Sequence, residues 1–350
     1  MYRRGARDTF NFLVPGAYRA LNRKRPFDVV VEDLNKIPFY GRLYVGPPRL
    51  NVVHHLFRET IYSETSCVFA TYLYLAERLI PALYRDDPFV AVSESTRQDL
   101  VRMGIPGDQI TVIHNAVDHA TYRQRGLGKF DRPTVSFLGR LKRYKNVECF
   151  IKAAKLVAER NPDVRFLIIG EGDHRPALMR LAAKLELDDV LEFTGYVDQE
   201  RKAELLERSH VVVNPSPKEG WGLTNIEANA CGTPVIAANS PGLRDSVLDG
   251  RSGLLFEYDN VEDLAEKIVQ VLTDSSLRAH LSEGALAWAA RFDWDQSAAQ
   301  MLEVLEEVAG RCWQGAASLR PRRGAGGSSL AGGGGVGPRD SGDTLGGRVL

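Results

Sequence analysis

The strongest constraint on how this chain folds is a regular alternation of short apolar runs with longer amphipathic segments, which begins near Asp131. The apolar runs are β-branched and too short for helices, so they predict buried strands. Strands that alternate with helices in this way form a doubly wound parallel sheet, which binds ligands beyond the carboxyl ends of its strands. The predicted strands are TVSFLG, VRFLIIG, VLEFTG, HVVVNPS and PVIAA, and the predicted helices span 147–159, 176–185, 200–207 and 223–230.

The first third of the chain shows the same alternation with less regularity. The runs DVVVE and LNVV predict buried parallel strands, and the second run ends in His54 and His55. FVAVSE predicts another strand, followed by a helix that Ser95 can cap and Gly104 can stop, and then the strand of TVIHNAVD. A chain of 350 residues, 44% of them hydrophobic, is long enough for two domains that each bury a core. The sequence therefore predicts an α/β protein with two doubly wound domains.

Charge and cysteine content exclude several classes of protein. Lys plus Arg and Asp plus Glu both number 45, so the net charge is zero and gives no indication of a nucleic-acid partner. The cysteines are far apart and form no paired spacing, which argues against a disulfide framework or a zinc site. We therefore expect a cytoplasmic protein. The four cysteines are Cys67, Cys149, Cys231 and Cys312.

No segment of the sequence has the pattern of a signal peptide or of a membrane span. The first residues, MYRRGARDTFNFLVPG, are basic but lack a long apolar core and a small-residue cleavage site. The most apolar stretch, residues 67–84, is interrupted by Glu77, Arg78 and Pro81, so it falls short of the ~20 apolar residues that a span requires. We expect a core helix there. A helix that lies in the plane of a membrane surface is the alternative.

The amino-acid composition changes near residue 310. Helical patterns at 261–272 and 295–308 close the ordered part, and the Gly-rich tail beyond residue 310 cannot bury apolar area, so it is expected to be disordered. Its glycines do not form a phosphate loop, because no strand precedes them and no helix follows.

The segment PSPKEGWGLTNIEANACGTPVIA, residues 215–237, combines glycines with two carboxylates at a strand-to-helix turn. Gly220 and Gly222 allow a ligand to approach the backbone, and the free amides at the start of a helix form an anion site that suits a diphosphate. Glu219 and Glu227 flank that anion and suit hydroxyl groups of a sugar and a ribose better than they suit a phosphate. The structural alternative is that both are ordinary acids at a helix start, which the helix dipole favours.

The segment FLGRLKRYKNVECF, residues 137–150, carries cations on the loop after another strand. This loop lies at the same edge of the predicted sheet as the Glu219 loop. Arg140 offers a planar fork and Lys145 a point charge, and together they can neutralise a diphosphate. A solvated basic loop is the alternative, because Lys142 and Arg143 are cationic too.

The combination of these segments resembles family 4 of the glycosyltransferases. GRLKRYKN is followed by IIGEGD, FTGYV, EGWGLTNIEANACGTPVIA and DGRSGLLFE, and Glu219 and Glu227 meet the family's pattern of two glutamates separated by seven residues. The resemblance extends from Phe27 to Val308 and implies the GT-B fold, two facing Rossmann-like domains. It implies an incomplete acceptor-side domain at 1–117, a donor-binding domain at 118–291, a helix at 292–309 that packs back toward the first domain, and a disordered tail at 310–350.

The resemblance implies a retaining hexosyltransferase that uses a UDP- or GDP-sugar and a glycan or lipid-linked acceptor, in cell-envelope polysaccharide synthesis, with peripheral membrane association possible. It places the donor diphosphate at Arg140 and Lys145, the transferred sugar at Glu219 and the ribose at Glu227, and it implies no essential metal. The amides of residues 222–224 would contact the phosphates and residues 195–197 the base. The donor-binding positions that it implies are Gly139, Gly195, Val197, Gly220, Gly222, Leu223, Thr224 and Glu227.

A histidine at the end of an N-terminal strand faces the donor sugar in this family, and LNVVHHLF matches that place. His54 is the first choice and His55 the second, because neighbouring residues of an extended chain point to opposite sides. A histidine satisfied within the core is the structural alternative. His114 stands where the family usually has Pro and is assigned no catalytic role. Residues 32–40 either line the acceptor pocket or form scaffold.

The chain departs from the family at its start, because the usual first strand, glycine-rich loop and helix have no counterpart and the resemblance implies that the chain begins inside a later helix. A misplaced start codon, a genuine fragment, or a partner that supplies the unit would each account for this, and a strand edge would be left exposed. Three functions remain open: a glycosyltransferase, a nucleotide-sugar-binding module without turnover, and a nucleotide-sugar epimerase of the same fold. Transfer of a labelled sugar separates the first two, and conversion of free donor without an acceptor marks the third.

Overall fold

The computed structural model describes residues 10–34, 37–63 and 65–318. Within these residues the chain forms two compact units. The smaller comprises residues 10–32, 39–50 and 302–318, and the larger comprises the described parts of 33–38 and 51–301. The predicted domain boundaries at 117 and 291 stay predictions.

The larger sheet has six strands in the order β10-β9-β8-β5-β6-β7, and each neighbouring pair is parallel. The chain runs outward from β5 to β7, returns to the other side of β5 with β8, and continues to β10. This is the doubly wound topology that the alternating pattern predicts. The strands are β5 (Thr134–Leu138), β6 (Arg165–Ile169), β7 (Leu191–Gly195), β8 (Val211–Asn214), β9 (Val235–Ala238) and β10 (Gly253–Phe256).

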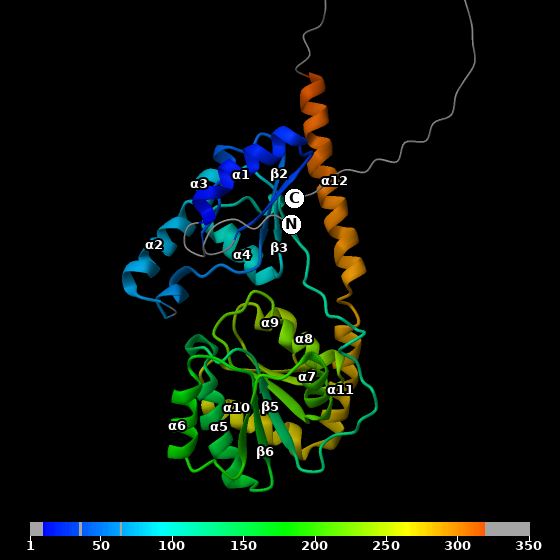
Figure 1. The fold of residues 1–350 in the computed structure, drawn as a ribbon. Coiled ribbons are helices and arrows are strands. Elements are labelled where there is room, and N and C mark those ends of the chain that lie inside the picture. Colours follow the sequence, from blue (N-terminus) through cyan, green and yellow to red (C-terminus); the bar gives the residue numbers. More distant parts are fainter. Residues whose placement is uncertain (1–9, 35–36, 64, 319–350) are drawn as a thin grey trace, which may run out of the picture. The chain divides into compact units, whose positions relative to one another are not determined.

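Helices cover both faces of this sheet (Figure 1). On one face α5 (Val147–Arg160) packs against α6 (Arg175–Lys184) and α10 (Val261–Thr273), and on the other α8 (Leu223–Ala230) packs against α7 (Gln199–Arg208) and α11 (Ser275–Ala289). The short helix α9 (Leu243–Ser246) follows β9. The predicted helices of this region are confirmed to within a few residues, whereas α11 was not predicted.

The smaller sheet has the order β1-β2-β3-β4, and β2, β3 and β4 are paired in parallel. After β3 comes α4, and Gly104 ends this helix in the left-handed conformation, as predicted. The predicted cap was wrong, because Ser93 and not Ser95 accepts the hydrogen bond from the amide of Thr96. The elements are β1 (Val30–Asp33), β2 (Arg49–Val53), β3 (Phe89–Ala91), α4 (Glu94–Met103), η3 (Gly107–Gln109) and β4 (Ile110–Val112).

The apolar stretch at 67–84 forms two short helices, α2 (Cys67–Arg78) and α3 (Ile80–Tyr84), after the 3-10 segment η2 (Arg58–Ser63). One face of α2 is buried, and Ala70 and Leu73 pack there against Ile61. The opposite face is exposed, so the prediction of a core helix was right for one side of α2 only. Within the described ranges, no helix combines the length and the apolarity that a bilayer crossing requires.

Two further helices lie toward the chain ends. The helix α1 (Phe10–Lys24) lies near the chain start, where the resemblance implied a helix, and the 3-10 segment η1 (Gly41–Leu43) follows β1. The last helix, α12, spans Trp294–Ser318, so residues 310–318 are helical where the sequence suggested a disordered tail. The rest of the predicted tail, 319–350, lies outside the described residues.

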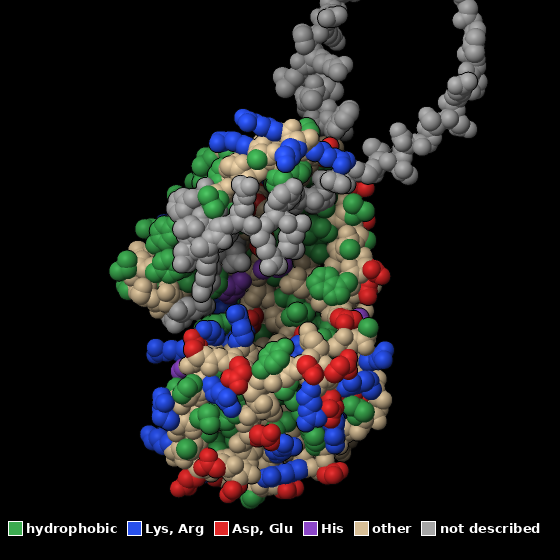
Figure 2. All heavy atoms as spheres, viewed as in Figure 1, with side chains coloured by type: hydrophobic (Ala, Val, Ile, Leu, Met, Phe, Trp, Pro, Cys, Tyr) green, Lys and Arg blue, Asp and Glu red, His purple; other side chains and the backbone are tan. Residues whose placement is uncertain are grey.

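Charged side chains of both signs are mixed over the viewed face of the six-stranded-sheet region (Figure 2). No field of a single sign gathers on that face of the region. This distribution agrees with the balanced count of 45 cationic and 45 anionic residues. It gives no electrostatic footprint of the kind that a nucleic-acid-binding surface has.

Candidate functional site

The strands of the larger sheet are added on one side of β5 up to β7 and then on its other side from β8 onward. The strand order therefore changes direction between β5 and β8, which are parallel neighbours. In a doubly wound sheet the loops that follow two such strands separate and leave a crevice, where ligands bind. The loop after β5 carries Arg140 and Lys145, and the loop after β8 carries Glu219. The sheet topology thus places both predicted loops at one switch point.

The loop after β5 leaves the sheet through glycine. A Cβ at Gly170, at the end of the neighbouring strand β6, would collide with the carbonyl oxygen of Gly139, so these two loops pack backbone against backbone. The Gly139 amide donates to the Ile169 carbonyl at 3.1 Å. Glycine at these two positions therefore allows the start of the Arg140 loop to pack directly against the end of β6.

The two predicted cations of this loop differ in their surroundings. Lys145, in the 3-10 segment η4 (Arg143–Lys145), forms an ion pair with Glu219, and both side chains are largely buried. Arg140 is exposed, and its guanidinium donates to the Tyr144 hydroxyl at 3.4 Å. Lys142, in the same loop, is paired instead with Asp173 at 2.6 Å. The structure thus brings Lys145 and Glu219 together and leaves Arg140 accessible to solvent.

The loop after β8 is held by close backbone contacts. A Cβ at Gly220 would collide with the carbonyl oxygen of His54, and a Cβ at Gly242 would collide with that of Glu219. The Glu219 amide donates to the carbonyl of Pro241 at 3.0 Å. The position of Glu219 is therefore fixed from two sides by main chain.

The helix α8 begins directly after this loop, at a left-handed Gly222 with φ of 76°. Its first turn is anchored by Asn225, which accepts from Asn214 at 3.0 Å and donates to Ser246 at 2.9 Å. The first amides of any helix have no partner within the helix, so the backbone of Gly222, Leu223 and Thr224 can receive an anion. The buried amide network holds this helix start in place.

Glu227, one turn into α8, is buried and forms an ion pair of 3.0 Å with Lys202 of α7. Burial raises the pKa of the Glu227 carboxyl, and the Lys202 ammonium and the Tyr122 hydroxyl oppose that rise. The second oxygen, Oε2, has no hydrogen-bond partner among the described residues. A buried carboxylate oxygen without a donor suits a ligand hydroxyl.

Sequence reasoning did not identify Lys202 or Tyr122. The Lys202 ammonium lies 4.7 Å from the centre of the Tyr122 ring, and the Tyr122 hydroxyl donates to Gln199. Tyr122 lies in the segment between β4 and β5, where no pattern marked it. The sequence offered one signal for Lys202. It lies next to Ala203 and four residues before Leu206 on α7, and both are buried, so the side chain of Lys202 could have been expected to face inward.

The predicted base-contacting residues follow β7. Gly195 has φ of 73°, and its carbonyl accepts from the Gly170 amide at 3.0 Å, which links the ends of β6 and β7. Val197 packs partly buried against Leu167 and Leu205, whereas Tyr196 is exposed. These residues lie at the carboxyl edge of the same sheet as the other two loops.

The two candidate histidines have different environments at the end of β2. His54 is exposed, and its carbonyl abuts Gly220. Burial lowers the pKa of His55 to about 4, helped by the ammonium groups of Lys218 and Lys145 and opposed by the Glu219 carboxylate. His55 therefore lies in the electrostatic field of the Lys145–Glu219 pair. Which of the two faces the transferred sugar stays a prediction.

A second buried ion pair, also missed from the sequence, joins the Glu219 loop to α4. Lys218 lies 2.6 Å from Asp99, and both side chains are largely buried. On the same helix the Thr96 hydroxyl donates to the Gly220 carbonyl at 3.4 Å, and the Ser95 amide donates to Asp245 at 2.8 Å. These partners are more than one hundred residues apart in sequence, so no local pattern could reveal them.

His114, which was assigned no catalytic role, lies in an aromatic stack. Its ring lies parallel to that of Trp221 with centroids 4.1 Å apart, and Phe292 contacts both rings edge-on. Its Nδ1 is 2.9 Å from the carbonyl oxygen of Val92. These contacts are those of a packed side chain.

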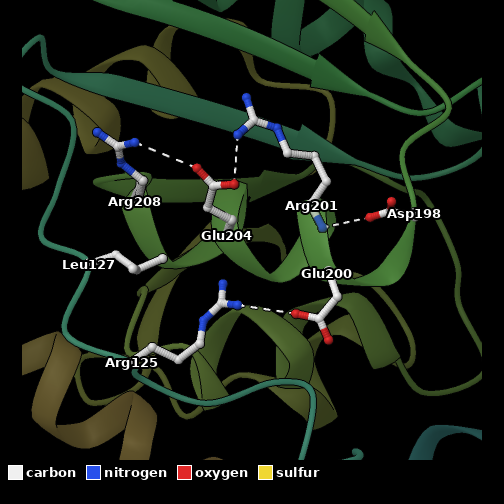
Figure 3. Close-up of a pocket in the computed structure, with 7 residues that line it drawn as sticks. All are labelled: Arg125, Leu127, Asp198, Glu200, Arg201, Glu204 and Arg208. Atoms are coloured by element: carbon white, nitrogen blue, oxygen red, sulfur yellow. Dashed lines mark hydrogen bonds and ion pairs between the residues drawn. The ribbon is translucent and has the colours of Figure 1, made fainter.

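Two hollows are lined by other parts of the chain. One, of about 570 Å³, is lined by charged side chains of α7 such as Arg201, Glu204 and Arg208, which pair with one another (Figure 3). No predicted site residue lines it. The other, of about 740 Å³, lies between α1, β1 and η1. Glu32 and Phe39, within the segment 32–40 that was expected to line an acceptor pocket or form scaffold, contribute to its wall, and Glu32 accepts from the amides of Phe39 and Gly41.

Metal-ligating side chains do not gather in the described part of the chain. Among these residues, no group of three or more His, Cys, Asp or Glu side chains is arranged to hold a metal ion. The candidate site itself combines cations, carboxylates and a helix start.

Two protein-family models match the sequence in adjacent parts. The model described as Glycosyl transferases group 1 matches residues 118–288, and the model described as Glycosyltransferase Family 4 matches residues 2–121. The first covers the loops of Lys145, Glu219 and Glu227. The second covers β2 and its two histidines.

Curated relatives are similar over the larger part of the chain. D-inositol 3-phosphate glycosyltransferase of Xylanimonas cellulosilytica is 33% identical over 244 residues, which cover 64% of this chain and 58% of the relative. The protein of the same name from Mycobacteroides abscessus is 33% identical, with coverage of 66% and 53%. The chain thus spans little more than half the length of the curated relatives it matches.

Solved structures show the same fold at lower identity. Sucrose-phosphate synthase from Thermosynechococcus elongatus superposes with a TM-score of 0.73 at 22% identity, covering 88% of this chain and 81% of that one. Anabaena Alr3699/HepE in complex with UDP and glucose superposes with a TM-score of 0.69 at 20% identity, with coverage of 87% and 84%. At these identities the likeness is evidence of a shared fold.

Proposed function

Because the chain belongs to the family 4 glycosyltransferases and has their GT-B fold, we propose that it transfers a hexose from a nucleoside-diphosphate sugar to a glycan or lipid-linked acceptor, with retention at the anomeric carbon. The observation that supports this most is the convergence of the Lys145 and Glu219 loops at the β5–β8 switch point, beside the start of α8. A diphosphate fits there because cations and helix amides both stabilise it.

In this proposal the diphosphate lies on the amides of Gly222, Leu223 and Thr224, within reach of Arg140 and Lys145. When the glycosyl bond breaks, negative charge develops on the leaving diphosphate and an oxocarbenium-like sugar is left. Preorganised cations and amides stabilise that charge without having to reorganise. We therefore propose that no metal is required for the reaction.

The two glutamates take separate roles. Glu219 contacts the transferred sugar, and its pairing with Lys145 holds it beside the diphosphate. Glu227 accepts hydrogen bonds from the ribose hydroxyls, for which its unpartnered Oε2 is suited. Gly195 and Val197 line the base, while Gly139 and Gly220 let the two loops come close to the ligand.

The acceptor side of the proposed site involves the end of β2 and the cavity beside α1. His54, or His55 in its place, contacts the donor sugar from the end of β2. The cavity between α1, β1 and η1 is proposed to contribute to acceptor binding, because apolar walls there meet the polar groups of Tyr18, Tyr44 and Lys24. We also propose that the protein works at a membrane surface on the cytoplasmic side, where lipid-linked acceptors are found.

The direct test is transfer of a radiolabelled hexose from UDP- and GDP-sugars by the full chain. The relatives and solved neighbours direct the first trials to UDP-glucose and to inositol 3-phosphate. We expect transfer with an α-configured donor to give an α-linked product in an NMR time course, and no loss of rate in EDTA. Donor binding without transfer or hydrolysis would support a binding module instead, and absence of binding to any nucleotide sugar would refute both functions. Interconversion of the free donor without an acceptor would favour an epimerase.

A further inference from the structure

The two chain neighbours of Glu219 are both attached to the helix α4. On one side, the Lys218 ammonium lies 2.6 Å from Oδ2 of Asp99, and these side chains are only 13% and 10% exposed. On the other side, the Gly220 carbonyl accepts from the Thr96 hydroxyl at 3.4 Å. The residue proposed to contact the transferred sugar therefore stands between two attachments to one helix.

The helix α4 is in turn fixed to the strand that carries the two candidate histidines. It follows β3 and packs against β3 and β4, and β3 is paired in parallel with β2. The carbonyl of His54, at the end of β2, abuts Gly220 of the Glu219 loop. The ion pair from α4 to Lys218 therefore fixes the Glu219 loop relative to the end of β2, and the sugar is proposed to be contacted from both.

The Lys218 ammonium has other carboxylates in its surroundings. Burial raises the pKa of Glu77 of α2, and main-chain amides and the Lys218 ammonium oppose that rise. Glu219 is the next residue in the chain and already pairs with Lys145. In a site that holds little water, an ammonium released from Asp99 is drawn to the nearest remaining carboxylate. Asp99 thus keeps Lys218 from competing with Lys145 for Glu219.

We propose that Asp99 is a positioning residue for glycosyl transfer, which acts through Lys218 to hold Glu219 in register with the end of β2. This role rests on the proposed function, because it requires that Glu219 contacts the reacting sugar. A misplacement of about 1 Å caused away from the chemistry can cost about a hundred-fold in rate. Loss of the pair should therefore lower kcat, while the diphosphate and ribose contacts keep the donor KM close to its normal value.

An apolar replacement of the pair separates positioning from simple stabilisation. Exchange of a buried ion pair for apolar side chains of similar size is often neutral for stability, so D99L/K218M should unfold in urea near the wild-type midpoint. We expect its kcat for glucose transfer from UDP-glucose to fall about 10- to 100-fold. The donor KM should stay within about three-fold. K218R, which keeps a cation for Asp99, should retain kcat within about three-fold.

Arg102→Gln is the matched control. Arg102 pairs with the other oxygen of Asp99 at 3.2 Å but is 65% exposed, so its loss should change kcat by less than about two-fold. Wild-type kcat in a stably folded D99L/K218M would overturn the proposal, because the pair would then only stabilise the fold. A higher donor KM with unchanged kcat would overturn it as well.

Hydrogen–deuterium exchange provides a readout that does not depend on turnover. The peptide of residues 215–222 should exchange faster in D99L/K218M than in wild type, because the loop has lost one attachment, while the helix α5 should exchange equally in both. Unchanged exchange in the loop would overturn the positioning role. Absence of transfer by the wild type refutes the proposed function itself, whereas equal transfer by wild type and D99L/K218M refutes the positioning role alone.

Discussion

The Lys202 ammonium lies 3.0 Å from Oε1 of the buried Glu227 and so joins α7 to α8. Both side chains are largely shielded from water, and the Tyr122 ring lies against the ammonium. Burial alone would drive Glu227 toward its neutral form, and Lys202 counteracts this by favouring the carboxylate. Lys202 therefore favours the charged form of the residue proposed to hold the ribose.

Lys202→Met should weaken donor binding about ten-fold. It should also raise the pH below which donor affinity falls, the acid limb of the binding profile. The direction follows because loss of the cation raises the pKa of Glu227 further, so the carboxylate persists only at higher pH. Calorimetric titration with the donor between pH 5 and pH 8 measures both effects. Lys267→Met, which removes a partly exposed pair with Asp263 at 3.5 Å, is the control and should change neither. An unmoved acid limb would show that Lys202 has no influence on the ribose carboxylate.

Glu227→Ala and Glu219→Ala should separate binding from turnover. Loss of Glu227 removes ribose contacts that exist in the ground state and the transition state alike, so the donor KM should rise while kcat changes little. Loss of Glu219 removes a contact to the reacting sugar, so kcat should fall about a hundred-fold or more while donor affinity changes little. Steady-state kinetics with donor titration distinguishes the two patterns. Identical constants for both variants and wild type would remove the assigned roles.

Lys145→Ala should lower kcat by about a hundred-fold or more, because the ammonium that offsets charge on the leaving diphosphate is lost. It also leaves Glu219 without its ion-pair partner. Lys142→Ala is the control within the same loop, since Lys142 pairs with Asp173 and is more exposed. Single-turnover rates at saturating donor measure the chemical step. Comparable losses in the two variants would indicate that the loop acts by general charge rather than through Lys145.

Gly220→Ala should destabilise the protein by about 1–3 kcal/mol, the range for overpacking at a close contact. The added methyl would collide with the carbonyl oxygen of His54, which belongs to a different strand end. Thermal and urea unfolding measure the change. Gly46→Ala, where a methyl meets nothing within 4 Å, is the control. Wild-type stability in Gly220→Ala would mean that the Glu219 loop does not rest on His54.

Unfolding free energy should fall as the pH is lowered from about 6.5 toward 4, in part because of His55. Its pKa is lowered from 6.5 to about 4 in the folded protein, so over this window the unfolded chain takes up the proton first. The contribution of His55 is fully present above pH 6.5 and is lost as the pH falls. His55→Gln should flatten the dependence measured by urea unfolding, and the exposed His280→Gln should not. His210, with a pKa also lowered to about 4, accounts for part of the remaining slope.

Much of the fold and of the candidate site was accessible from the sequence because both depend on local patterns. Strand and helix identities follow from short-range periodicity, and α8 was predicted with the bounds that it has, Leu223–Ala230. The loops of Lys145 and Glu219 could be assigned to one sheet edge because parallel strands point their carboxyl ends the same way. The helix α11 was missed because its apolar positions lack a single clear face.

The amino-acid sequence by itself determined the order of β/α units, the glycines at the loop ends and the pair of glutamates separated by seven residues. Only the tertiary structure decided which charges meet. Lys202 reaches Glu227, Lys218 reaches Asp99, and His55 lies in the field of Glu219. The physical reason is that an ion pair depends on distance and burial between separate elements, and both are set by how helices and strands pack, not by spacing along the chain.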